Sequence, residues 1–63
     1  MKKGVVKFYN HKKGFGFIRD EETQEEYFVG EKGLLEKIVD NDLVFFELRE
    51  GKKGVNAFNV KKR

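Results

Sequence analysis

The chain has 63 residues, no cysteine and one histidine, which excludes disulfides, thiolate metal sites and histidine-rich zinc sites. Its 14 basic and 11 acidic residues give a modest net charge of +3. This length fits one domain over residues 1–63, near the lower limit for a chain that folds without covalent or metal cross-links.

No apolar run approaches the roughly 20 residues that a membrane-spanning helix needs, and no long apolar stretch follows the N-terminal lysines. We therefore expect no signal peptide and no membrane partner. The lack of cysteine is compatible with a reducing compartment, and we expect a cytoplasmic location.

Charges are unevenly distributed along the chain. Residues 1–19 carry basic side chains and no acid, residues 20–26 carry acids and no base, and residues 51–63 are again basic without an acid. Such segregation is typical of a basic face bordered by an acidic loop. A high content of charge also keeps small domains in solution, so this pattern alone leaves both interpretations open.

Two strands joined by a polar turn are predicted in the first third. Val5–Tyr9 is rich in β-branched and aromatic residues, and Asn10–Lys13 forms a turn whose asparagine can bond to the backbone. In the second strand, residues 14–19, alternation places Phe15 and Phe17 on one face. Exposed rings beside lysines suit stacking on nucleic-acid bases, whereas buried rings would be ordinary core, and this stretch alone does not decide.

Three further strands are predicted over Glu26–Val29, Leu43–Arg49 and Val55–Val60. Between the first two of these, the apolar spacing within Leu34–Val39 indicates about one helical turn that closes an open end of the sheet. Five short strands with one helical turn between the third and fourth predict an all-β fold, a small closed antiparallel barrel.

The predicted interior consists of apolar residues that share the core-facing parity of their strands. They are Val6, Ile18, Val29, Leu34, Val44, Phe46, Leu48 and Val60. Phe58 has the parity of Val60 and is also expected on the core side. Phe45 has the opposite parity, so we expect an exposed ring. Such a ring fits either a lone surface aromatic or a self-association contact. Without self-association through Phe45 we expect a monomer.

Three segments carry a resemblance. Lys13–Ile18 reads Lys-Gly-Phe-Gly-Phe-Ile, Lys7–Asn10 reads Lys-Phe-Tyr-Asn, and Tyr27–Val29 reads Tyr-Phe-Val. In these the chain resembles the bacterial cold-shock family of five-stranded oligonucleotide-binding (OB-fold) barrels, whose first ribonucleoprotein motif is identical to Lys13–Ile18. Glu50–Gly54 and Asn59–Val60 also fit, so the resemblance covers nearly the whole chain. RNA-recognition-motif domains share a similar hexapeptide but need two full helices, which no segment here predicts.

The resemblance implies a binding face for single-stranded RNA or DNA on the first three strands. In the family, bases stack on the aromatic residues that match Phe8, Phe15, Phe17 and Phe28. Basic positions match Lys7, Lys13 and Lys53, and a polar base contact matches Asn10. The implied function is binding of low sequence specificity, as in an RNA chaperone or a regulator of gene expression, with cold induction left open.

Two features, one in the Lys7–Asn10 segment and one in the second motif, affect this face. Phe8 reaches it only through a local bulge, because Val6 has the same parity and is predicted core. Tyr9 is then either a further contact or packing at the rim. Gly30-Glu31 stands where the family has His-Phe, and the segment 30–43 looks about four residues shorter than usual. The loss of about three rings weakens the expected binding.

A diverged barrel is the alternative function, with weak or no nucleic-acid binding and a protein contact through Phe45 or Gly30–Val39. An enzyme is not expected, because the carboxylates of residues 20–26 lie in a polar turn that predicts no buried pair and no perturbed acid. They also lack the ligand spacing of an EF-hand loop, and Gly14-Phe15-Gly16 lacks the Gly-Lys-Ser/Thr of a phosphate loop. We expect no metal and no cofactor.

Overall fold

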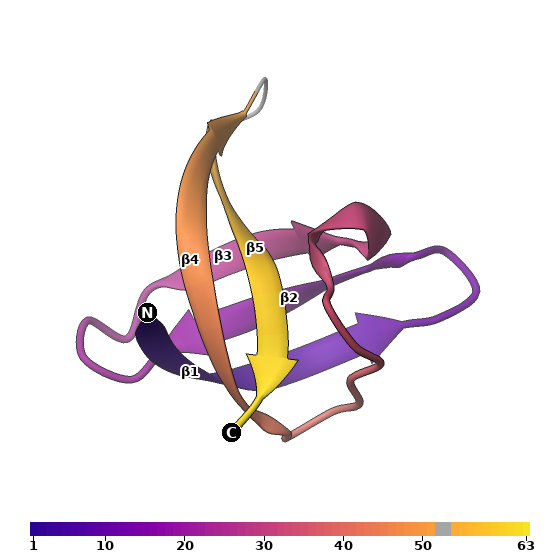
Figure 1. The fold of residues 1–63 in the computed structure, drawn as a ribbon, viewed down its shortest axis with the longest axis horizontal. Coiled ribbons are helices and arrows are strands. Elements are labelled where there is room, and N and C mark those ends of the chain that lie inside the picture. The colour runs from indigo at the N-terminus through magenta and orange to yellow at the C-terminus, as the bar shows by residue number, and fades with distance from the viewer. Residues whose placement is uncertain (52–53) are drawn as a thin grey trace.

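The computed structural model describes residues 1–51 and 54–63, which form five strands and one short 3-10 helix (Figure 1). The elements are β1 (Lys2–Asn10), β2 (Phe15–Asp20), β3 (Glu26–Gly30), η1 (Glu31–Gly33), β4 (Leu43–Gly51) and β5 (Gly54–Lys62). The predicted strands are confirmed, with slightly different ends. In the described part of the chain, no helix has the length and apolar character needed to cross a membrane.

The strands close into a barrel in the order β1-β2-β3-β5-β4, with β4 returning to pair with β1. Figure 1 shows the long β4–β5 hairpin crossing over the three strands β1 to β3. The predicted all-β closed barrel of five strands is confirmed, and its pairing is antiparallel except between β3 and β5, which run parallel at Phe28 and Asn56. Strand directions cannot alternate all the way around a closed ring of five, because five is odd.

The predicted bulge in β1 is confirmed. Val6 lies opposite Ile18, but Phe8 lies opposite Phe17, so one residue of β1 is skipped in the pairing. Phe8 therefore points outward while Tyr9 is 7% exposed and belongs to the core. Gly16 permits this geometry, since a Cβ there would stand 2.2 Å from the Phe8 carbonyl oxygen.

Residues 34–42, here called the strap, cross the end of the barrel without forming a helix, with bends at 35–36 and a turn at 40–41. The predicted helical turn between the third and fourth strands is confirmed, but it lies in η1 and not within Leu34–Val39. The Leu35 N–H donates to the Val60 carbonyl at 2.8 Å, and the Asn41 N–H donates to the Val6 carbonyl at 2.7 Å. A short segment must bridge β5 and β1, and extended chain covers about 3.3 Å per residue against 1.5 Å in a helix.

The barrel interior largely matches the predicted one. Val6, Ile18, Val29, Val44, Phe46 and Val60 are fully buried, as predicted. Leu34 and Leu48 are only half-buried and pack against this core, which Tyr9, Ile38 and Ala57 complete. Ile38 comes from the strap, so an apolar segment does close the barrel end, but this segment is not helical.

Phe58 does not face the core, contrary to the prediction. Asn59 has a left-handed φ of 52°, and the β4–β5 pairing shifts register at this point. Ala57 and Val60, three residues apart, therefore both face inward and Phe58 is half-buried on the outside. Phe45 also departs from its prediction, because its ring is half-buried rather than exposed.

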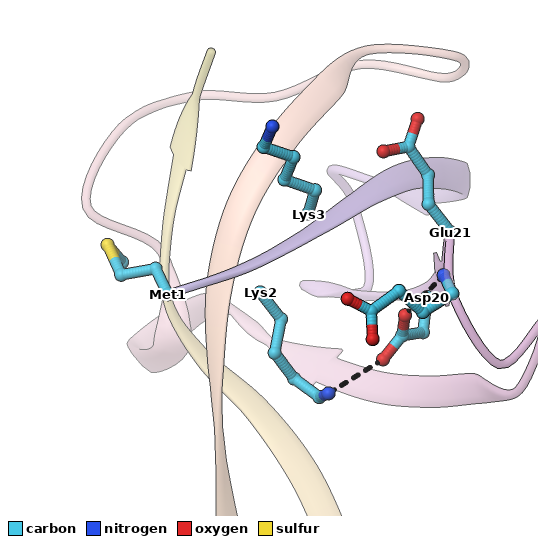
Figure 2. A pocket seen from close by; sticks show the side chains of 6 residues that line it. Met1, Lys2, Lys3, Asp20 and Glu21 are labelled. Atoms are coloured by element: carbon cyan, nitrogen blue, oxygen red, sulfur yellow. Dashed lines mark hydrogen bonds and ion pairs between the residues drawn. The ribbon is translucent and has the colours of Figure 1, made fainter.

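Asp20 corrects the expectation that the acidic segment holds no buried pair and no perturbed acid. It is 1% exposed, and its Oδ2 lies 3.1 Å from Lys2 Nζ (Figure 2). Its Oδ1 accepts hydrogen bonds from the Glu22 and Thr23 N–H groups. Burial opposes ionisation, but these N–H groups and the Lys2 ammonium outweigh it and hold the pKa of Asp20 below its ordinary 3.8. The pair fastens the start of β1 to the end of β2.

Candidate nucleic-acid interface

Four phenylalanines from β1, β2 and β3 form one contiguous cluster on the outside of the barrel, here called the aromatic platform. The Phe8 ring centroid lies 6.1 Å from that of Phe15 and 5.6 Å from that of Phe17. Phe28 lies 6.0 Å from both Phe15 and Phe17. Each ring therefore contacts two others, and the four rings predicted from sequence are neighbours.

The platform is accessible to a flat ligand. Phe8 is 39% exposed and Phe28 is 40% exposed, while Phe15 and Phe17 between them are half-buried. The neighbouring residue Ile18 points the other way and is fully buried in the core. The rings thus cover the outer face of a wall whose inner face carries the fold, and aromatic faces of this kind can stack on bases.

The platform ends at the departure from the second motif. Phe15 lies opposite Gly30, and a Cβ at Gly30 would stand 3.6 Å from the Phe28 ring, so a side chain there would extend the aromatic surface. The Glu31 N–H donates to the Gly14 carbonyl at 3.0 Å, which holds this residue against the turn before Phe15. A carboxylate therefore borders the platform at that end.

Lys7 lies beside the platform but is already paired. Its Nζ is 3.1 Å from Glu26 Oε2, and Arg19 Nη2 is 3.6 Å from the same oxygen. The hydrogen bond from Lys7 outweighs desolvation and, with Arg19, holds the pKa of Glu26 below its ordinary range. Sequence reasoning missed Glu26 as a competitor for these cations, although it is the strand partner of Arg19. A phosphate must compete with Glu26 for Lys7.

The turn between β1 and β2 holds the remaining predicted contacts. Asn10 Oδ1 accepts hydrogen bonds from the N–H groups of Lys12 and Lys13, both at 3.0 Å. This confirms the predicted local bonding, which engages the carbonyl oxygen of the Asn10 side chain and not its NH₂ group. The Lys13 side chain is exposed next to the platform strand β2. The predicted contact Lys53 lies outside the described residues.

The described residues give no support to metal chemistry. Over residues 1–51 and 54–63, no three side chains of the metal-ligating types gather into a group. His11 is exposed, and its ring packs edge-on against Tyr9 with centroids 4.9 Å apart. The arrangement offers stacking surfaces and cations rather than ligands for an ion.

Comparison with known proteins gives consistent matches over this whole barrel. The family model described as the 'Cold-shock' DNA-binding domain matches residues 2–63. The chain is 38% identical to the major cold shock protein of Micrococcus luteus over 94% of each chain, and 39% identical to the cold shock-like protein CspE of Buchnera aphidicola over 92% of this chain and 90% of that one. It is also 35% identical to the Y-box-binding protein 1 of Xenopus laevis, of which it covers 22%. The chain belongs to the cold-shock domain family.

Proposed function

We propose that this protein binds single-stranded RNA or DNA with low sequence specificity and acts as an RNA chaperone of the cold-shock type. The observation that carries the proposal is the aromatic platform, four mutually contacting rings on the outer face of β1 to β3. Every base has a π-face, so stacking binds a single strand without reading its sequence. A base stacked on a ring is not available for pairing, which opposes RNA secondary structure.

Each member of the proposed site has a distinct role. Phe8, Phe15, Phe17 and Phe28 stack on bases. Lys7 and Lys13 neutralise phosphates, and the Asn10 NH₂ group donates to a base edge. Lys53 joins them on the strength of the family resemblance alone. Because Lys7 exchanges Glu26 for a phosphate, its net contribution is smaller than that of an unpaired lysine.

The chemistry proposed is binding without catalysis. We propose a monomer in the cytoplasm that uses neither metal nor cofactor. Self-association through Phe45 is the less favoured arrangement, because that ring is half-buried and offers a partner little apolar surface. Sedimentation of the free protein over a range of concentrations distinguishes the two.

The test is fluorescence titration of a Phe8→Trp variant with oligothymidine. The chain has no tryptophan, so the substituted residue reports from the platform alone, and a stacked base should quench it. The logarithm of affinity should fall linearly with the logarithm of salt concentration, by about 0.7 for each phosphate contacted on a single strand. Absence of binding even at low salt would overturn the proposal and favour the diverged barrel that contacts protein instead.

A further inference from the structure

The platform belongs to a row of residues that crosses all five strands. Phe8 pairs with Phe17, and Phe17 pairs with Phe28. The row continues from Phe28 to Asn56 on β5 and from Asn56 to Arg49 on β4. Neighbouring strands are about 4.8 Å apart, so Asn56 and Arg49 follow Phe28 at about 5 and 10 Å. The row thus changes from aromatic to polar and cationic side chains.

An open pocket of about 240 Å³ lies where the row changes. Phe28 forms its border with the platform, and Lys32, Arg49, Asn56 and Phe58 supply its other functional side chains. The absence of a side chain at Gly30, another lining residue, leaves the border with Phe28 open. The site where the family motif is lost therefore adjoins a hollow that a planar group can enter.

Tight packing brings Lys32 to this pocket. A Cβ at Gly33 would stand 2.9 Å from the Ala57 carbonyl oxygen, so η1 approaches β5 more closely than a residue with a side chain would permit. Lys32 precedes that contact and is exposed. An ammonium group is thus available beside the pocket for a phosphate.

Arg49 and Phe58 form a layered pair at the far side of the pocket. The Arg49 guanidinium lies 4.3 Å from the centroid of the Phe58 ring. Within residues 1–51 and 54–63, no carboxylate is within ion-pair distance of Arg49, in contrast to Lys7 and its partner Glu26. A guanidinium held on a ring presents its plane to a ligand at little cost in side-chain entropy, and bases stack on such planes.

We propose that this pocket is a subsite for one further nucleotide of the strand bound on the platform. The base stacks on the Arg49 guanidinium that Phe58 supports, and the Asn56 amide, both donor and acceptor, bonds to the base edge. Lys32 neutralises the adjoining phosphate. The subsite rests on the proposed function, and it replaces on β4 and β5 part of the stacking surface that Gly30-Glu31 no longer provides.

The test compares two tryptophan reporters over a series of oligothymidines from about two to eight nucleotides. Phe8→Trp should be quenched at every length that binds, whereas Phe58→Trp should be quenched only by oligonucleotides long enough to pass Phe28. Arg49→Lys keeps the charge and removes the plane, so it should weaken binding of the long oligonucleotides about 5-fold or more and leave the short ones within about 2-fold. Lys61→Gln, a charge removal at the other end of β5, should leave the length dependence unchanged.

The outcomes separate the subsite from the platform. The subsite would be overturned, and the platform retained, by the following combination of results. Phe8→Trp is quenched, Phe58→Trp is not quenched, and Arg49→Lys keeps the wild-type length dependence. An equal loss in Arg49→Lys at all lengths would also overturn it, since Arg49 would then act by general attraction. No quenching of either reporter would overturn the proposed function and the subsite together. Arg49→Lys needs no change in packed volume at Phe58, so it tests the subsite even if Phe58→Trp perturbs the fold.

Discussion

Replacing Phe17 by alanine separates the binding role of the platform from its role in the fold. The Phe17 ring contacts Phe8 at 5.6 Å and Phe28 at 6.0 Å between centroids. Aromatic pairs contribute about 0.5–1.5 kcal/mol each beyond the area that they bury, so the variant should lose at least about 1–3 kcal/mol of folding stability. A 63-residue domain has about 3–9 kcal/mol in total, and the variant should remain folded at low temperature. Loss of one stacked base, about 1–3 kcal/mol, should weaken oligothymidine binding about 5- to 150-fold.

The measurement combines urea unfolding with titration of labelled oligothymidine. Phe45→Ala is the matched control, because it removes another half-buried phenylalanine that lies outside the platform, on β4. It should cost stability without changing affinity. If Phe17→Ala binds as tightly as the wild type, the stacking argument is refuted. If Phe17→Ala unfolds, the ring is core and the separation of the two faces is wrong.

Three further predictions concern residues of the strands that carry the platform. Glu26→Gln releases Lys7 for phosphate, and should raise affinity for oligothymidine about 2- to 5-fold and steepen its salt dependence. Asp20→Asn should cost about 1–3 kcal/mol in urea unfolding at pH 7. Because the folded-state pKa of Asp20 is lowered, this difference is present above its ordinary 3.8 and should vanish as the pH falls through the folded value. Gly16→Ala should cost about 1–3 kcal/mol or more and displace Phe8, which weakens binding as well.

Each of these has a control in the same chain. Gly30→Ala adds a methyl group that only contacts the Phe28 ring at ordinary distance, so its stability in urea unfolding should stay close to that of the wild type, unlike that of Gly16→Ala. Glu22→Gln alters a neighbouring exposed acid of the segment that contains Asp20. Its folding stability should match the wild type at pH 7 and also below the folded-state pKa of Asp20. An unchanged salt dependence in Glu26→Gln would show that Lys7 does not contact phosphate.

The alternation of side chains predicted the strands and most of the core, because a two-residue period is local information. The bulge in β1 needed the family resemblance as well, because only the resemblance places Phe8 on the binding face although it has the parity of the predicted core residue Val6. The bulge in β5 was not predictable in the same way. Phe58 and Val60 both suit an interior, and only the left-handed φ of Asn59 puts Ala57 there instead.

Interactions between distant segments account for the other differences. Asp20 reads as one more acid in a polar turn, and its burial depends on Lys2 from the opposite strand end. The strap has apolar spacing suited to a helix, but its length has to bridge two strands. The pairing of Lys7 with Glu26 likewise requires the relative position of β1 and β3. None of these contacts leaves a periodic pattern in the sequence.

The distribution of charge around the platform indicates how the binding energy divides. Glu26 holds Lys7 and Arg19 on one side, and Glu31 borders the platform on another. Approach of a phosphate to Lys7 therefore replaces an existing ion pair instead of creating a new one, and the electrostatic gain at this position is small. The rings meet no such competition from the part of the chain that the structure describes, because Phe8 and Phe28 are exposed there. Affinity should then depend more on the number of stacked bases than on salt, which makes an additional stacking surface at Arg49 and Phe58 the most effective way for this chain to hold a longer strand.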